Sequence, residues 1–78
     1  MSPAEILQVL EAAEPNVSWS TAGDGYHNEV EGVSDVFEGL NAVKRQQFVY
    51  AILNPYIADG RLHAVIIRTF TPAEKASA

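Results

Sequence analysis

Cysteine is absent from the 78-residue sequence. The chain therefore cannot form a disulfide, and it cannot bind a metal ion through thiolates of its own. Long apolar runs are absent too, so no segment approaches the roughly 20 apolar residues that cross a bilayer as a helix. Residues 1–5, MSPAE, lack the basic and apolar parts of a signal peptide. Together these absences predict a cytoplasmic protein with no membrane segment.

Basic residues are also scarce, with five Lys and Arg against ten Asp and Glu, which gives a net charge of -5. An acidic domain repels nucleic acid at long range, and this disfavours a general role in binding nucleic acid. A local basic patch stays open as an alternative, because all the basic residues lie in the second half of the chain. They are Lys44, Arg45, Arg61, Arg68 and Lys75. The length predicts one domain over residues 1–78, with a small core.

The first part of the chain predicts a helix followed by a hairpin. Residues 2–5 carry the Ser, Pro and Glu of a capping box at a helix N-terminus. Pro15 ends this helix, because the residue before a proline is pushed out of helical geometry. Residues 16–20 and 26–33 are then expected to be two antiparallel strands, joined by a tight turn over residues 22–25.

The second part predicts a long helix, a strand and a short helix. Asn41 is a suitable cap for the long helix, and Pro55 is expected to kink or split it near Asn54. The strand over residues 62–70 is apolar on both faces, so it is expected to be covered on both. Residues 71–78 begin with Thr-Pro-Ala-Glu, which predicts a short C-terminal helix or tail.

The order of these elements predicts an α+β fold. A hairpin makes the first two strands antiparallel, and the helical crossover makes the third strand parallel to its neighbour, with a right-handed connection. The expected architecture is a three-stranded mixed sheet with helices on one face.

Two histidines are the candidates for chemistry. His63 stands within the predicted third strand, and His27 stands where the turn meets the second strand. A histidine in an apolar strand is more often a packed residue with one hydrogen bond than a ligand, so both interpretations stay open from the residues alone. Asp24 is close enough in sequence to orient the His27 ring. No pairing of a nucleophile with a base is found, and the protein is not expected to be an enzyme.

Several sequence blocks resemble the BolA family. They are FEG at 37–39, Arg45, VY at 49–50, RLHAV at 61–65 and the segment 69–74. GDGYH at 23–27, VKRQQFVY at 43–50, YIADGRLHAV at 56–65 and TPAE at 71–74 look closest to the IbaG branch of that family. The resemblance covers residues 17–74, with the blocks in the family's order.

The resemblance implies a fold similar to the type II KH domain, with the order αββαβα. It also implies a heterodimer with a monothiol glutaredoxin, in which a [2Fe–2S] cluster is shared for iron–sulfur cluster trafficking or iron homeostasis. His63 corresponds to the usual cluster ligand and His27 to the second one, while glutaredoxin and its glutathione supply sulfur. Alone, the protein is expected to be a monomer without a cofactor.

The two expected ligands differ in their surroundings. His63, as a strand residue, is expected to be held rigidly, and His27, beside a turn, is expected to move. Thr21 and Ala22 look like extra length in that turn, which would change how far His27 reaches. A [2Fe–2S] cluster needs four ligands. A chain with two histidines and no cysteine is therefore consistent with a site that a partner completes.

The alternative function is a nucleic-acid-binding transcriptional regulator of the stress response that uses the KH-like surface, since some relatives bind DNA. Lys44, Arg45, Arg61 and Arg68 are the candidate contacts to nucleic acid or to a partner. The family often has Arg-His-Arg where this chain has Arg-Gln-Gln at 45–47, so positive charge is missing there. The GXXG loop of RNA-binding KH domains is also missing between the helices.

Overall fold

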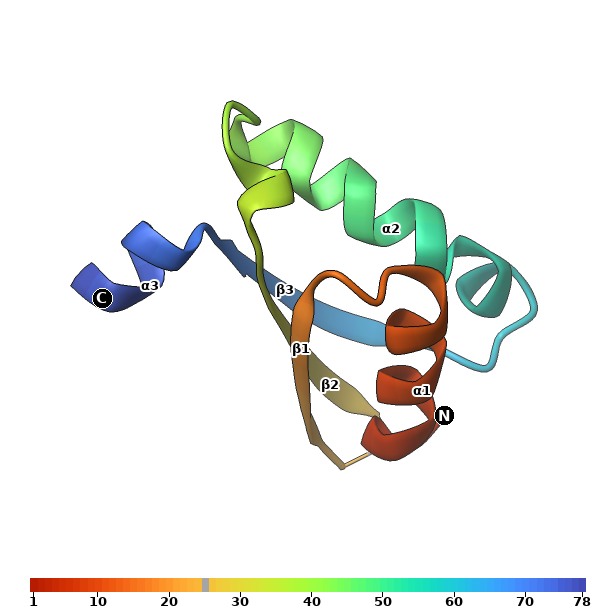
Figure 1. Cartoon of the computed structure of the whole chain (residues 1–78). Helices are drawn as coiled ribbons and strands as arrows, with labels where there is room; N and C mark the ends of the chain where they lie inside the picture. Colours follow the sequence, from red (N-terminus) through yellow and green to blue (C-terminus); the bar gives the residue numbers. More distant parts are fainter. Residues whose placement is uncertain (25) are drawn as a thin grey trace.

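A computed structural model describes residues 1–24 and 26–78. In chain order, its elements are α1 (Pro3–Ala13), β1 (Ser18–Gly23), β2 (His27–Val33), the 3-10 helix η1 (Asp35–Phe37), α2 (Ala42–Ala58), β3 (Ala64–Phe70) and α3 (Pro72–Ser77). The strands form one sheet in the order β1-β2-β3, with β1 antiparallel and β3 parallel to β2. The expected α+β class and mixed sheet are confirmed. Figure 1 shows α3 projecting beyond the end of β3, away from the other helices.

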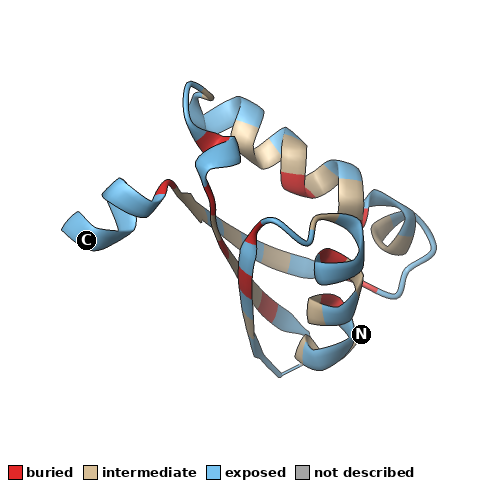
Figure 2. Ribbon diagram, viewed as in Figure 1, coloured by how far each residue is buried: buried red, intermediate tan, exposed pale blue. Residues whose placement is uncertain are grey.

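One hydrophobic core lies between the sheet and the helices α1 and α2. Ile6 and Leu10 of α1 and Val49 and Leu53 of α2 are fully buried in it. The spacing of four within each pair puts both members on the same face of their helix. On the sheet, Val30 of β2 and Trp19 of β1 belong to the same buried core. Figure 2 shows buried red segments on α1, on α2 and on the sheet. Both helices therefore cover the same face of the sheet.

The two proline-led capping boxes form as the sequence predicts. The Ser2 hydroxyl accepts a hydrogen bond from the Glu5 N–H at 3.2 Å, and the Glu5 carboxylate accepts one from the Ser2 N–H at 2.9 Å. Thr71 and Glu74 repeat this exchange at 3.2 Å and 2.8 Å. Because each box satisfies backbone donors with its own side chains, the start of α1 and of α3 is determined locally.

Helix α2 is not split at Asn54, so that part of the expectation was wrong. The helix continues through Pro55 to Ala58. Pro55 removes one backbone hydrogen bond only, and the buried Leu53 holds the preceding turn against the core. Neither this helix nor any other in the described part of the chain is long and apolar enough to cross a membrane.

Strand β3 is shorter and more exposed than the sequence predicts. It begins at Ala64 rather than at residue 62, and Ala64, Ile66 and Arg68 are exposed, with Ile66 at 54%. The expectation of a strand covered on both faces was wrong for a physical reason. The core is built against one face of the sheet, and the side chains of β3 on the other face stay exposed. The alternate residues of β3 therefore point toward solvent.

Candidate ligand site at the ends of β2 and β3

The pairing of β2 with β3 brings the backbones of the two histidines close together. Strand β2 begins at His27, and the residue of β3 that pairs with His27 is Ala64, which directly follows His63. Because the two strands are parallel, they begin at the same edge of the sheet. The crossover through α2 thus places two imidazoles from distant parts of the sequence at adjacent positions.

His63 is exposed and lies just outside the strand, so the expectation that it stands within β3 was wrong. The connection after α2 explains this position. The backbone N–H groups of Arg61 and Leu62 both donate to the Tyr56 carbonyl at 3.0 Å, and the Leu62 side chain is buried. The Leu62 side chain therefore points into the core, and the next residue, His63, is exposed to solvent.

The turn before His27 is organised by the Asp24 carboxylate. Its Oδ1 accepts hydrogen bonds from the N–H of His27 at 2.8 Å and from the N–H of Tyr26 at 2.9 Å. These two backbone donors, that of His27 first, hold the pKa of Asp24 below its usual value. Oδ2 lies 3.9 Å from His27 Nδ1, which is beyond hydrogen-bond distance. Asp24 therefore fixes the backbone that carries His27 rather than its ring.

Gly23 allows the turn to close tightly. It has a φ of 133°, and a Cβ there would lie 2.2 Å from the carbonyl oxygen of His27. The expected turn also included Gly25, which lies outside the described residues. Thr21 and Ala22 lie within β1, paired with Val30 and Glu29. They lengthen the strand, so the expected extra length in the turn was wrong.

The two imidazoles line different hollows. His27 shares its hollow with Ala64 and Ile66 on the open face of the sheet. His63 lies in another hollow, with Tyr26 and Arg61. Nowhere in residues 1–24 and 26–78 do three or more His, Asp or Glu side chains gather to hold a metal ion. The arrangement offers two exposed imidazoles at one edge of the sheet.

Tyr26 is the residue at this edge that reasoning from the sequence missed. Its ring stacks on the His63 imidazole, with the ring centroids 5.8 Å apart and the planes at 17°. The parallel register would have revealed this pair. Once His27 pairs with Ala64, the residues before them, Tyr26 and His63, become neighbours as well.

Among the basic candidates, Arg45 is committed to contacts inside the protein. Its Nε donates to the Leu40 carbonyl at 2.9 Å, and its two terminal nitrogens bind the Glu74 carboxylate at 2.6 Å and 3.3 Å. The side chain is only 14% exposed. This ion pair and its hydrogen bonds, Arg45 first, hold the pKa of Glu74 below its usual value. Arg45 thus fastens α3 to the start of α2.

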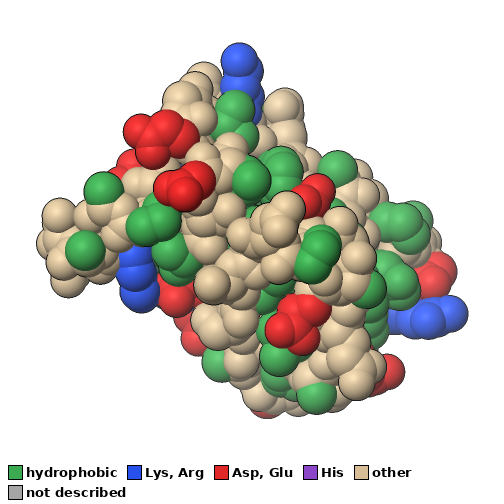
Figure 3. All heavy atoms as spheres, viewed as in Figure 1, with side chains coloured by type: hydrophobic (Ala, Val, Ile, Leu, Met, Phe, Trp, Pro, Cys, Tyr) green, Lys and Arg blue, Asp and Glu red, His purple; other side chains and the backbone are tan. Residues whose placement is uncertain are grey.

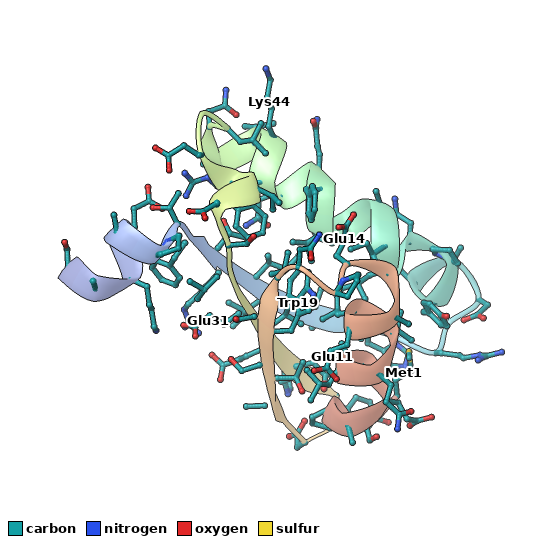
Figure 4. The ribbon with its side chains drawn as sticks, in the orientation of Figure 1. Met1, Glu11, Glu14, Trp19, Glu31 and Lys44 are labelled. Atoms are coloured by element: carbon teal, nitrogen blue, oxygen red, sulfur yellow. The ribbon has the colours of Figure 1, made fainter. Side chains whose placement is uncertain are left out.

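The other basic candidates are spread over the surface. Lys44 is exposed and points away from the helices, as Figure 4 shows. Arg61 forms an ion pair with Asp59 at 3.1 Å, and Arg68 forms one with Glu29 at 2.8 Å on the open face of the sheet. On the face drawn in Figure 3, the blue side chains lie in separate places with acidic ones between them. The structure does not bring these residues together into one basic patch.

The order of elements and the mixed sheet define a small α+β domain of the type II KH-like kind. Comparison with known proteins makes the assignment specific. The chain belongs to the BolA-like protein family, whose model matches residues 4–74. The resemblance inferred from the sequence blocks is therefore confirmed.

Similar proteins of known sequence include a bacterial and a plant one. The acid stress protein IbaG of Escherichia coli strain K12 is 46% identical over 74 residues, which cover 95% of this chain and 88% of that protein. The chloroplastic protein BOLA1 of Arabidopsis thaliana is 38% identical over 80 residues, covering 91% of this chain and 49% of that protein. The expected likeness to IbaG is thereby confirmed.

Solved structures of the family superpose on nearly the whole chain. A bolA protein homologue from Coxiella burnetii gives a TM-score of 0.85 at 30% identity and covers 97% of both chains. The BolA domain of SufE1 from Arabidopsis thaliana gives a TM-score of 0.78 at 30% identity, covering 92% of this chain and 93% of that one. The fold is therefore that of the BolA family.

Proposed function

We propose that this protein is a binding partner of a monothiol glutaredoxin and shares a [2Fe–2S] cluster with it, in iron–sulfur cluster trafficking or iron homeostasis. Membership of the BolA family supports a role in iron–sulfur biology. In this proposal the protein is a cytoplasmic binding module rather than an enzyme. It is monomeric and free of cofactor until the complex forms.

The observation that carries the proposal is the exposed pair of imidazoles at the ends of β2 and β3 in a chain without cysteine. A [2Fe–2S] cluster takes four ligands, and two histidines on one iron is a known arrangement. His63 and His27 supply the nitrogen ligands, while the glutaredoxin and its glutathione supply the sulfur ligands. Binding through imidazole requires neutral rings with a free lone pair.

From the sequence, His63 was expected to be the rigid ligand and His27 the mobile one. The surroundings of the two histidines lead us to revise this expectation. His27 is the residue that belongs to a strand, and its backbone is held by Asp24. His63 precedes a strand, and its ring rests against Tyr26. The two side chains line separate hollows.

Alanine substitution of each histidine tests the proposal. We expect His63→Ala to abolish the spectrum of the histidine-bound cluster, because it removes the principal nitrogen ligand. His27→Ala should leave a weaker and more labile cluster. The measurement is visible circular dichroism of each variant, mixed with the glutaredoxin and a reconstituted cluster.

Folding of the variants provides the control. Both histidines are exposed, so each variant should stay folded. We expect a change in the free energy of unfolding below about 0.5 kcal/mol for His27→Ala, and of up to about 1.5 kcal/mol for His63→Ala, which also loses the stack with Tyr26. Ser20→Ala, at an exposed position on β1, should leave both the spectrum and the stability unchanged. A His63→Ala variant with the parent spectrum and the parent cluster lifetime would refute the proposed function.

A further inference from the structure

Tyr26 is placed to control the orientation of one proposed ligand. Tyr26 is 71% exposed, yet its ring lies nearly parallel to the His63 imidazole, with the centroids 5.8 Å apart. This separation and angle are those of an offset stack, a favourable arrangement for two aromatic rings. A large ring held in solvent beside a candidate ligand is not explained by the packing of the core.

The position of the Tyr26 ring is set by the turn. The Tyr26 N–H donates to Asp24 Oδ1 at 2.9 Å, and the same oxygen accepts the N–H of His27 at 2.8 Å. Gly23 closes the other side of the turn with its φ of 133°. One carboxylate therefore fixes the backbone of two consecutive residues. One of them is a proposed ligand, and the other carries the ring that contacts the second proposed ligand.

His63 needs such a contact because its own backbone does not restrain the ring. It lies outside β3, its side chain is exposed, and it follows the buried Leu62. An exposed side chain with free rotation loses conformational entropy when it binds a metal ion. A stacked neighbour removes part of that freedom beforehand, which favours binding in the same way as any preorganised site.

We propose that Tyr26 is a positioning residue for His63. It holds the imidazole plane ready for the cluster and couples the turn that carries His27 to the second ligand. This inference rests on the proposed function, which it deepens. Replacing the aromatic ring should shorten the lifetime of the shared cluster roughly two- to tenfold, the factor that corresponds to the loss of one aromatic pair.

Two substitutions at position 26 separate the ring from its hydroxyl group. Tyr26→Phe keeps the ring and the stack, and Tyr26→Leu keeps an apolar side chain of similar reach without an aromatic face. The first measurement uses the protein without cluster and follows the His63 ring protons by NMR, with those of His27 as the internal reference. A stacked ring shields the protons that lie over it. We expect this shielding in the parent and in Tyr26→Phe, and its loss in Tyr26→Leu.

The second measurement is the decay of the visible circular dichroism of the cluster shared with glutaredoxin. We expect the parent lifetime for Tyr26→Phe and a two- to tenfold shorter one for Tyr26→Leu. Urea unfolding of Tyr26→Phe should match that of the parent. Tyr26→Leu should remain folded in the absence of urea, because the side chain is exposed, so unfolding would not account for a shorter lifetime.

The outcomes distinguish this inference from the function on which it rests. If Tyr26→Leu leaves the His63 shielding unchanged, the stack does not restrain the ring and the inference is wrong. If the shielding is lost but the lifetime is that of the parent, while His63→Ala abolishes the spectrum, the positioning role is wrong and the proposed function stands. If His63→Ala leaves the spectrum intact, both are wrong.

Discussion

At the scale of single residues, Gly32 shows how closely a core side chain packs against the backbone of the sheet. Gly32 pairs with Trp19 across the β1–β2 ladder, and the indole ring lies against the Gly32 backbone. The indole N–H donates to the Glu14 carbonyl at 3.0 Å, so the end of α1 holds the ring in place. Trp19 is labelled in Figure 4, between α1 and the sheet. Glycine is needed at this position for space, because any side chain would meet the ring.

We expect Gly32→Ala to destabilise the protein by about 1–3 kcal/mol, the usual cost of overfilling a packed site. The added Cβ would lie 2.6 Å from Trp19 Cζ3 and 2.9 Å from Cε3, so the ring or the strand must shift. Urea unfolding followed by tryptophan fluorescence measures the change. The exposed Ser20→Ala on β1 is the control, with a change below about 0.5 kcal/mol. Equal stability of parent and Gly32→Ala would mean that the ring moves aside at no cost.

At the scale of elements, α3 is a helix that depends on ion pairs instead of a buried face. It has six residues and none of them is buried, and a helix this short is not stable alone. Glu74 joins it to Arg45 of α2, and Lys75 joins it to Glu31 of β2 at 2.8 Å. The Lys75 ammonium also lies 5.0 Å from the centre of the Phe70 ring. The docking of α3 should therefore respond to charge.

Acid should release α3 before the core unfolds. The pKa of the Glu74 carboxyl is lowered in the folded protein, chiefly by Arg45. A lowered carboxyl pKa stabilises the docked state above the ordinary glutamate value, about 4.3. That stabilisation is lost as the pH falls through the lowered value. NMR of the α3 amides between about pH 6 and pH 3 should show this step, with the Val49 amide of the buried face of α2 as the reference.

Substitution of the same carboxyl gives the matched control. Glu74→Gln keeps the shape of the side chain and removes its charge, so α3 should already be loosened at neutral pH and should show no further step attributable to residue 74. If the α3 amides of the parent stay unchanged down to pH 3 while the core remains folded, the Arg45–Glu74 pair does not hold the helix.

The sequence predicted the elements that local interactions determine. The capping boxes at Ser2 and Thr71 and the hairpin depend on residues close together in the chain, and the parallel crossover follows from the order of elements. The exposure of Ile66 could not be read in this way. An apolar strand can have the same sequence whether its second face is covered by another layer or is open to solvent. The stack of Tyr26 on His63 depends on the register of β2 with β3, which only the folded chain determines.

At the scale of the whole molecule, the basic charges are nearly all neutralised within the protein. Arg45, Arg61, Arg68 and Lys75 each lie within 3.1 Å of a carboxylate oxygen. In the part of the chain that the structure describes, Lys44 is the basic residue without such an ion pair. The carboxylates beside the other four would repel an approaching phosphate, and the net charge of -5 adds to that repulsion at long range.

Binding to duplex DNA should therefore be weak and without preference for sequence. We expect a Kd above about 10⁻⁶ M near physiological salt, as for nonspecific association. Because each phosphate contact contributes a slope of about -0.9 to the dependence of log K on log salt, a surface with Lys44 as its unpaired cation should give a slope near -1. Fluorescence anisotropy with a labelled duplex over a range of salt concentrations measures both quantities.

Lys44→Ala should remove most of the binding, and Ser20→Ala should leave it unchanged. A sequence-selective Kd of about 10⁻⁸ M or tighter, as dedicated regulators show, would instead favour the nucleic-acid function over the shared cluster.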